Sequence, residues 1–160
     1  MTYARLAQEL EALLSGERDL IANAANTAAL VFHGLSGLNW AGFYLLRGNE
    51  LVVGPFQGQP ACVRIALGRG VCGTAAARRR TVIVRDVHAF PDHITCDSAS
   101  RSEIVVPLIL DGRLLGVLDL DSPVTGRFDE EDGKGLERLA TIFTAACRPQ
   151  NPSKPPPSKT

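Results

Sequence analysis

The sequence has 160 residues, 45% of them hydrophobic, and its 17 basic and 17 acidic side chains balance. This length suits one domain with a substantial apolar core. The charge balance argues against nucleic acid or an anionic membrane as a partner and favours a small or neutral one. Neither a membrane span nor a signal peptide is recognisable, so we expect a cytoplasmic protein without membrane contact.

The first elements in the chain are predicted to be two amphipathic helices. Apolar side chains recur every three or four residues over residues 3–14 and again over residues 17–33. From Asn39 onward the pattern changes to short apolar runs separated by turn residues, which predict about six strands. These runs cover residues 40–46, 51–53, 61–65, 82–84, 104–110 and 114–120.

Two more helices are expected, one between the strands and one after them. Residues 71–79 predict a short helix, and the last helix begins at Asp129, whose side chain can cap the amides of Glu131 or Asp132. The elements indicate a single α+β domain with a mostly antiparallel sheet, flanked by the N- and C-terminal helices that cover one of its faces.

The predicted domain covers residues 1–147. Residues 148–160 contain five prolines and no large apolar side chain, which is typical of a disordered tail. A proline-rich ligand for a recognition domain is the alternative interpretation of this segment.

A glycine pattern before the short helix resembles a nucleotide-binding motif. Gly68, Gly70 and Gly73 match the G-x-G-x-x-G fingerprint of dinucleotide-binding folds. However, only about ten residues connect this turn to the next strand, and no second βαβ unit follows. The pattern therefore favours a glycine turn into a short helix.

The four cysteines are Cys62, Cys72, Cys96 and Cys147. A chain of this size does not need disulfides to form a core, which favours a reducing compartment. Because the cysteines form no Cys-x-x-Cys pair and accompany no paired histidines, we expect no structural metal site.

Cys96 lies in the longest polar stretch of the sequence, residues 86–103, between two predicted strands. Loops of this length are usually functional or disordered. Two histidines and an arginine in the stretch can lower a thiol pKa, whereas the acidic side chains around them oppose this. Both a nucleophile and an inert thiol in a mobile lid remain open for Cys96.

Carboxylates form a second candidate site. Asp119 and Asp121 lie two residues apart on a predicted strand, so their side chains share a face. If Glu103 joins them, three carboxylates on one half-enclosed face cannot all stay ionised cheaply, and at least one pKa should rise enough to make that group a proton donor. The cluster suits a ligand ammonium, with a solvated acidic rim or a hard-cation site as the alternatives.

The face on which Glu103 lies depends on the turn between the last two strands. A strict two-residue turn at Asp111-Gly112 would place Glu103 opposite Leu120, on the wrong face. A three-residue loop from Leu110 to Gly112 would place it opposite Asp119. We predict the three-residue loop.

Several segments together resemble the free methionine-R-sulfoxide reductases, a GAF-domain family, over residues 30–146. Ordinary GAF sensor domains share the fold but lack this set of cysteines, which makes the resemblance specific. The segments are Asn39–Tyr44, Gly54–Gly58, Ala61–Cys62, Gly70–Ala76, Asp86–Pro91, Cys96–Glu103 and Gly116–Ser122.

The resemblance implies an enzyme that reduces the R-sulfoxide of free methionine. Cys96 corresponds to the catalytic cysteine, which becomes a sulfenic acid, and Cys62 to the resolving cysteine that forms a disulfide with it. Cys72 corresponds to a third thiol of less settled role. Thioredoxin would reopen the disulfide, no bound cofactor is required, and a homodimer is compatible with the family.

The substrate-binding residues implied by the resemblance are aromatic or acidic. Trp40, the only tryptophan, starts the first predicted strand, where the residue alone suits either the core or a pocket wall. The non-enzymatic alternative is a GAF domain that senses a small molecule or a redox change. The implied binding set is Trp40, Tyr44, Glu103, Asp119 and Asp121.

Overall fold

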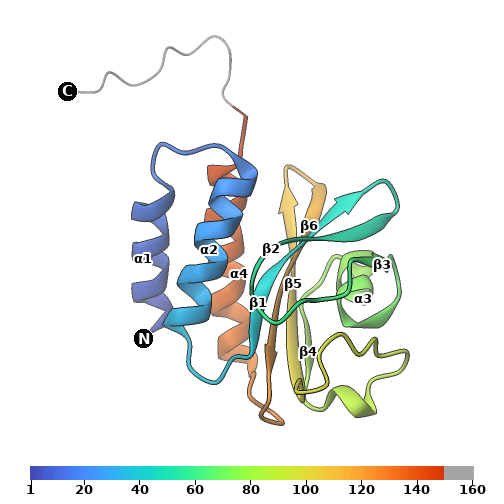
Figure 1. Cartoon of the computed structure of the whole chain (residues 1–160). Coiled ribbons are helices and arrows are strands. Elements are labelled where there is room, and N and C mark those ends of the chain that lie inside the picture. Colours follow the sequence, from blue (N-terminus) through green and yellow to red (C-terminus); the bar gives the residue numbers. More distant parts are fainter. Residues whose placement is uncertain (150–160) are drawn as a thin grey trace, which may run out of the picture.

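The computed structural model describes residues 1–149, in which one sheet lies between a layer of long helices and a smaller layer (Figure 1). The elements in chain order are α1 (Tyr3–Leu14), α2 (Leu20–Gly34), β1 (Trp40–Arg47), β2 (Glu50–Gly58), β3 (Arg64–Ala66), α3 (Gly70–Arg78), β4 (Val82–Val84), the 3₁₀ turn η1 (Val87–Ala89), β5 (Ser102–Leu110), β6 (Arg113–Ser122) and α4 (Glu130–Ala146). Residues 150–160 lie outside the described part, so the disordered tail stays a prediction.

The sheet has the order β3-β2-β1-β6-β5-β4, and every neighbouring pair is antiparallel. The six predicted strands are confirmed, although β2 extends to Gly58 and β3 begins only at Arg64. Within residues 1–149 no helix is both long and apolar enough to cross a membrane. The α+β prediction with flanking terminal helices is confirmed.

The helix starts follow from their capping residues. Helix α2 begins three residues later than predicted, because the Asp19 side chain accepts a hydrogen bond from the amide of Ala22 (2.8 Å) and caps the helix there. Helix α4 begins as predicted, since Asp129 accepts from the amide of Asp132 and the Asp132 side chain accepts from the amide of Asp129 (both 3.0 Å).

Helices α2 and α4 cover one face of the sheet, and α1 packs against these two helices (Figure 1). Alternate residues of β1 supply this core. The ring of Phe43 packs against that of Phe143 from α4, with 4.7 Å between centroids, whereas Trp40 and Tyr44 belong to the cluster on the opposite face. The main core therefore lies between the sheet and the terminal helices, and it leaves the other face free to form a site.

That other face is also covered, by α3 and the segments around it, which adds to the one-face covering expected from the sequence. The glycine pattern serves this packing. A Cβ atom on Gly73 would lie 2.4 Å from the carbonyl oxygen of Ala66, and the Gly68 amide donates to the Gly73 carbonyl oxygen (2.8 Å). Because the sheet has no parallel pair, the pattern marks a tight turn rather than a dinucleotide site.

The turn between β5 and β6 corrects the predicted loop. Leu110 pairs with Arg113, so the connection is the two-residue turn Asp111-Gly112, whose φ angles of 51° and 77° suit a primed turn that follows the strand twist. The additional residue is Leu115, which forms a bulge within β6. Glu103 consequently faces Asp121 rather than Asp119, but still lies on the predicted face.

Candidate active site

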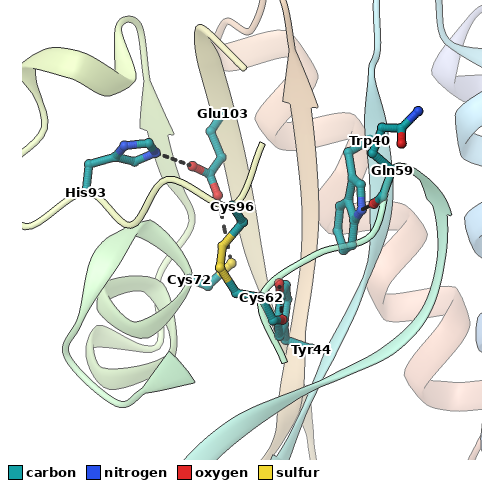
Figure 2. Close-up of a disulfide and its surroundings, with 8 residues drawn as sticks. All are labelled: Trp40, Tyr44, Gln59, Cys62, Cys72, His93, Cys96 and Glu103. Atoms are coloured by element: carbon teal, nitrogen blue, oxygen red, sulfur yellow. Dashed lines mark hydrogen bonds and ion pairs between the residues drawn. A yellow bond between two sulfur atoms is a disulfide. The ribbon is translucent and has the colours of Figure 1, made fainter. Parts of the chain in front are cut away.

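A disulfide joins Cys62 and Cys96 on the α3 side of the sheet (Figure 2). Cys62 lies between β2 and β3, and Cys96 lies in the long segment between η1 and β5. Their Cα atoms are 5.3 Å apart although 34 residues separate them in sequence, a distance that ordinary disulfides span. The fold thus brings together the two cysteines that the resemblance pairs.

A cavity of about 40 Å³ lies beside this disulfide, between the sheet, α3 and the segment that carries Cys96. It contacts every residue of the predicted site except Cys62, which is bonded to a lining residue. The predicted residues that line it are Trp40, Tyr44, Cys72, Cys96, Glu103, Asp119 and Asp121.

Strand register brings the three carboxylates to one wall of the cavity. β6 lies between β1 and β5, and Asp121 pairs with Trp40 on one side and with Glu103 on the other. Asp119 lies two residues before Asp121, on the same face of β6. Cys72, from α3, faces this wall and its thiol donates a weak hydrogen bond to Glu103 Oε1 over 3.8 Å.

Burial favours the protonated forms of Glu103, Asp119 and Asp121, which together form what we call the acidic wall of the cavity. This burial raises the pKa of Glu103 and of Asp121 well above the usual values, and the nearby charge of Asp119 raises both further. Burial also raises the pKa of Asp119, to about 6, partly offset by hydrogen bonds from Glu103 and Cys72. The pKa of the Cys72 thiol is raised by burial first and by Asp119 next. Near neutral pH the wall therefore holds proton donors, as the sequence pattern suggested.

Trp40 and Tyr44 form an aromatic wall and belong to the core at the same time, so both interpretations of Trp40 hold. The indole of Trp40 stacks on Tyr44 and Phe56, at centroid distances of 5.8 and 5.2 Å, and its Nε1–H donates to the carbonyl oxygen of Gln59 (3.1 Å; Figure 2). The Tyr44 hydroxyl donates to the carbonyl oxygen of Cys62 (3.0 Å). This bond ties the wall directly to the disulfide.

His93 is a site residue that the sequence did not single out. Its Nε2 lies 3.9 Å from Glu103 Oε2, and the ring lines the cavity (Figure 2). Burial, followed by the charge of His88, lowers the pKa of His93, so its ring is neutral at neutral pH and carries no charge to pair with Glu103. Its position three residues before Cys96 was the available signal, but its partner on β5 was not predictable.

Asn39 is a second residue whose role the sequence did not reveal. Its Nδ2 donates to Asp97 Oδ2 and to Ser100 Oγ, both over 3.1 Å, and its backbone amide donates to the Asp121 carbonyl oxygen (3.0 Å). Asn39 therefore connects the segment directly after Cys96 to the end of the acidic strand.

Replacing Asn39 with alanine should loosen that segment without unfolding the sheet. Losing two hydrogen bonds, one of them to a carboxylate, removes about 1.5 kcal/mol of local stability, so amides 97–100 should exchange with solvent roughly ten-fold faster. Hydrogen exchange read by mass spectrometry measures this effect, with amides of residues 104–109 as the internal control. Equal protection of residues 97–100 in both proteins would show that other contacts hold the segment.

The arrangement combines three functions in one small space. Cys62 and Cys96 can give up two electrons by forming their disulfide, the acidic wall can deliver a proton, and the aromatic wall can pack against an apolar group. Such a site suits the two-electron reduction of a small molecule that carries a positive charge.

Comparisons with known proteins agree with this chemistry. The GAF domain family profile matches residues 3–147. The chain is 55% identical over 137 residues to a protein named free methionine-R-sulfoxide reductase from Escherichia coli strain K12, covering 86% of this chain and 83% of that one. The structure of free methionine-R-sulfoxide reductase from Neisseria meningitidis in complex with its substrate is 50% identical, with a TM-score of 0.88, and covers 91% and 87% of the two chains.

A structure named as a GAF sensor protein, from Burkholderia vietnamiensis, is also similar. It is 62% identical, with a TM-score of 0.88, over 92% of this chain and 96% of that one. Its name describes the domain type that the family profile identifies in this chain.

Proposed function

The chain belongs to the GAF-domain family of free methionine-R-sulfoxide reductases, and we propose that it reduces the R-sulfoxide of free methionine with the thiols of Cys96 and Cys62. The observation that carries the proposal is the disulfide between these cysteines beside a cavity with an acidic and an aromatic wall. The catalytic domain in this proposal spans residues 1–147.

The proposed reaction converts one sulfoxide and two thiols into one thioether, one disulfide and one water. The Cys96 thiolate attacks the sulfoxide sulfur while a protonated carboxyl of the acidic wall donates to the oxygen. Oxygen passes to Cys96 as a sulfenic acid and methionine leaves. The Cys62 thiolate then attacks the Cys96 sulfur and water departs, which leaves the disulfide seen in Figure 2.

Selectivity for the free amino acid follows from the charge of the acidic wall. Asp119, with a pKa of about 6, is ionised near neutral pH and attracts the ammonium group of methionine sulfoxide, to which Glu103 and Asp121 offer hydrogen-bond acceptors. A methionine residue within a peptide has no such group. Trp40 and Tyr44 supply the apolar surface against which the methyl group packs.

The size of the cavity sets the order of events. A volume of about 40 Å³ holds about three water molecules, which is too small for a whole amino acid. The substrate therefore enters the reduced form, in which the segment carrying Cys96 is released from Cys62, and methionine leaves before or as the disulfide closes.

The disulfide must be reopened by an external dithiol, and a thioredoxin-type carrier fits this step. Cys62 and Cys96 are both partly exposed, so a carrier thiolate can reach the bond. The cycle needs a reducing compartment such as the cytoplasm. One chain supplies both cysteines and the whole acidic wall, so a homodimer is compatible with the proposal but is not required by it.

Turnover of defined sulfoxides tests the proposal. With a dithiol reductant present, the purified protein should form methionine from free methionine-R-sulfoxide and leave the S epimer and N-acetylated R-sulfoxide unchanged. Chiral chromatography of the remaining sulfoxide measures both preferences. If neither epimer is consumed, the protein is a GAF domain that binds a ligand or senses redox state without catalysis.

A further inference from the structure

Cys72, Glu103 and Asp119 place three potential metal ligands around one point, a group that we call the deep triad. One donor atom from each residue lies within 4.8 Å of the other two. The Cys72 Sγ to Glu103 Oε1 distance is 3.8 Å, close to the roughly 3.5 Å that separates sulfur and oxygen ligands of one tetrahedral zinc ion. Small rotations of side chains would complete this geometry.

The deep triad is buried and lacks a compensating positive charge. Cys72 and Asp119 are 4% exposed and Glu103 is 7% exposed. Asp119 Oδ1 is buried and has no hydrogen-bond partner. Because Asp119 lines the cavity, this oxygen is available to accept a ligand there. Among residues 1–149 no lysine or arginine forms an ion pair with the triad, and the one basic side chain paired with it is His93, whose Nε2 lies 3.9 Å from Glu103 Oε2.

The donor set indicates which cation would fit. One thiolate and two carboxylates suit a borderline cation such as Zn²⁺, whereas Mg²⁺ and Ca²⁺ need six or more oxygen ligands. The cavity of about 40 Å³ leaves room for a water molecule as the fourth ligand.

We propose that the deep triad binds a divalent cation of the zinc class in exchange for the protons of Cys72 and Glu103, and that the bound cation inhibits the protein. The binding step involves no electron transfer, because both ligands only exchange a proton for the metal. The inhibition rests on the proposed function, since the cation would occupy the place of the substrate ammonium. This assigns Cys72 a property that is separate from the disulfide cycle.

The disulfide form allows the site to be tested without the other two active-site thiols. Titrating that form with Co²⁺, which accepts the same tetrahedral ligands as Zn²⁺, should produce a thiolate-to-cobalt charge-transfer band that saturates at one ion per chain. Zn²⁺ should remove the band, and Mg²⁺ should not. Cys72→Ser should abolish the band, whereas Cys147→Ser, the matched free thiol outside the cavity, should keep it.

A second variant keeps the test decisive if Cys72→Ser fails to fold. Asp119→Asn preserves the shape of the side chain and should weaken Co²⁺ binding at least ten-fold. Absence of the band in the folded wild-type protein, or its persistence without Cys72, would overturn the proposed metal site.

Activity separates the failure of this proposal from the failure of the proposed function. If the protein turns over free methionine-R-sulfoxide but shows no charge-transfer band with Co²⁺, the proposed function is supported and the proposed metal site is wrong. If the band forms without turnover, the metal site stands alone. With both present, Zn²⁺ should raise KM for the sulfoxide at constant kcat, and a fall in kcat alone would overturn the assignment of the cation to the ammonium position.

Discussion

Replacing Cys96 with serine is expected to lower the turnover of free methionine-R-sulfoxide at least about a thousand-fold. A serine hydroxyl stays protonated near neutral pH, so it cannot attack the sulfoxide sulfur, and it cannot take up the oxygen as a sulfenic acid. The initial rate of methionine formation with a dithiol reductant measures the loss. Appreciable turnover by C96S would rule out Cys96 as the nucleophile.

Two other cysteine variants show whether the loss is specific. Cys147 ends α4 away from the cavity, so Cys147→Ser should keep the wild-type rate. Without any added reductant, Cys62→Ser should form about one methionine per chain and then stop, because the sulfenic acid on Cys96 has no resolving partner. A dimedone adduct found by mass spectrometry on Cys96 would identify that arrested state.

Replacing Asp119 with asparagine should have opposite effects on activity and on stability. Activity with free methionine-R-sulfoxide should fall about a hundred-fold, because the negative charge facing the substrate ammonium is lost. Stability should rise above pH 6. The pKa of Asp119 is about 6 in the folded protein, compared with about 3.9 in an unfolded chain.

The sign of the stability change follows from these two pKa values. Well below pH 4 Asp119 is protonated in both states, so its titration costs nothing. As the pH rises from 4 to 6 the unfolded chain releases its proton first, and the wild-type protein loses up to about 3 kcal/mol of its free energy of unfolding. Asparagine does not titrate and avoids this loss.

Thermal unfolding of the disulfide form at pH 4 and pH 8 measures the effect. Asp119→Asn should unfold at a higher temperature than the wild type at pH 8, with a much smaller difference at pH 4. The exposed Glu11 of α1 offers a control, since Glu11→Gln should change stability little at either pH. A less stable Asp119→Asn protein at pH 8 would contradict the proposed cost of burying this carboxylate.

The sequence predicted the strands well, but it did not predict where the sheet becomes irregular. Glu103 was expected to reach the face of Asp119 and Asp121 through a longer loop, and it reaches that face through the bulge at Leu115. A longer loop and a bulge each shift the β5–β6 pairing by one residue, which moves the Glu103 side chain onto the face of the sheet that carries Asp119 and Asp121. The Asp-Gly pair fits both turns, so the sequence alone could not choose between them.

The polar contacts that complete the site were beyond prediction from one sequence. Asn39 and Ser100 are 61 residues apart, and His93 reaches Glu103 from a segment without a regular period. Their residue types are common on protein surfaces, so nothing in the local pattern marks them. Cys96, Asp119 and Asp121 were identifiable because a thiol in a polar loop and acids at alternate strand positions each indicate specific chemistry. The roles of Cys62 and Cys72 followed only from the family resemblance.

A single-turnover experiment tests the central claim most directly. Fully reduced protein is mixed with one equivalent of free methionine-R-sulfoxide in the absence of any other reductant, and the products are analysed by peptide mapping under acidic conditions that prevent thiol exchange. We expect one methionine per chain together with one new disulfide, between Cys62 and Cys96, and a free thiol at Cys72. Methionine formed while Cys62 and Cys96 both remain thiols would contradict the account.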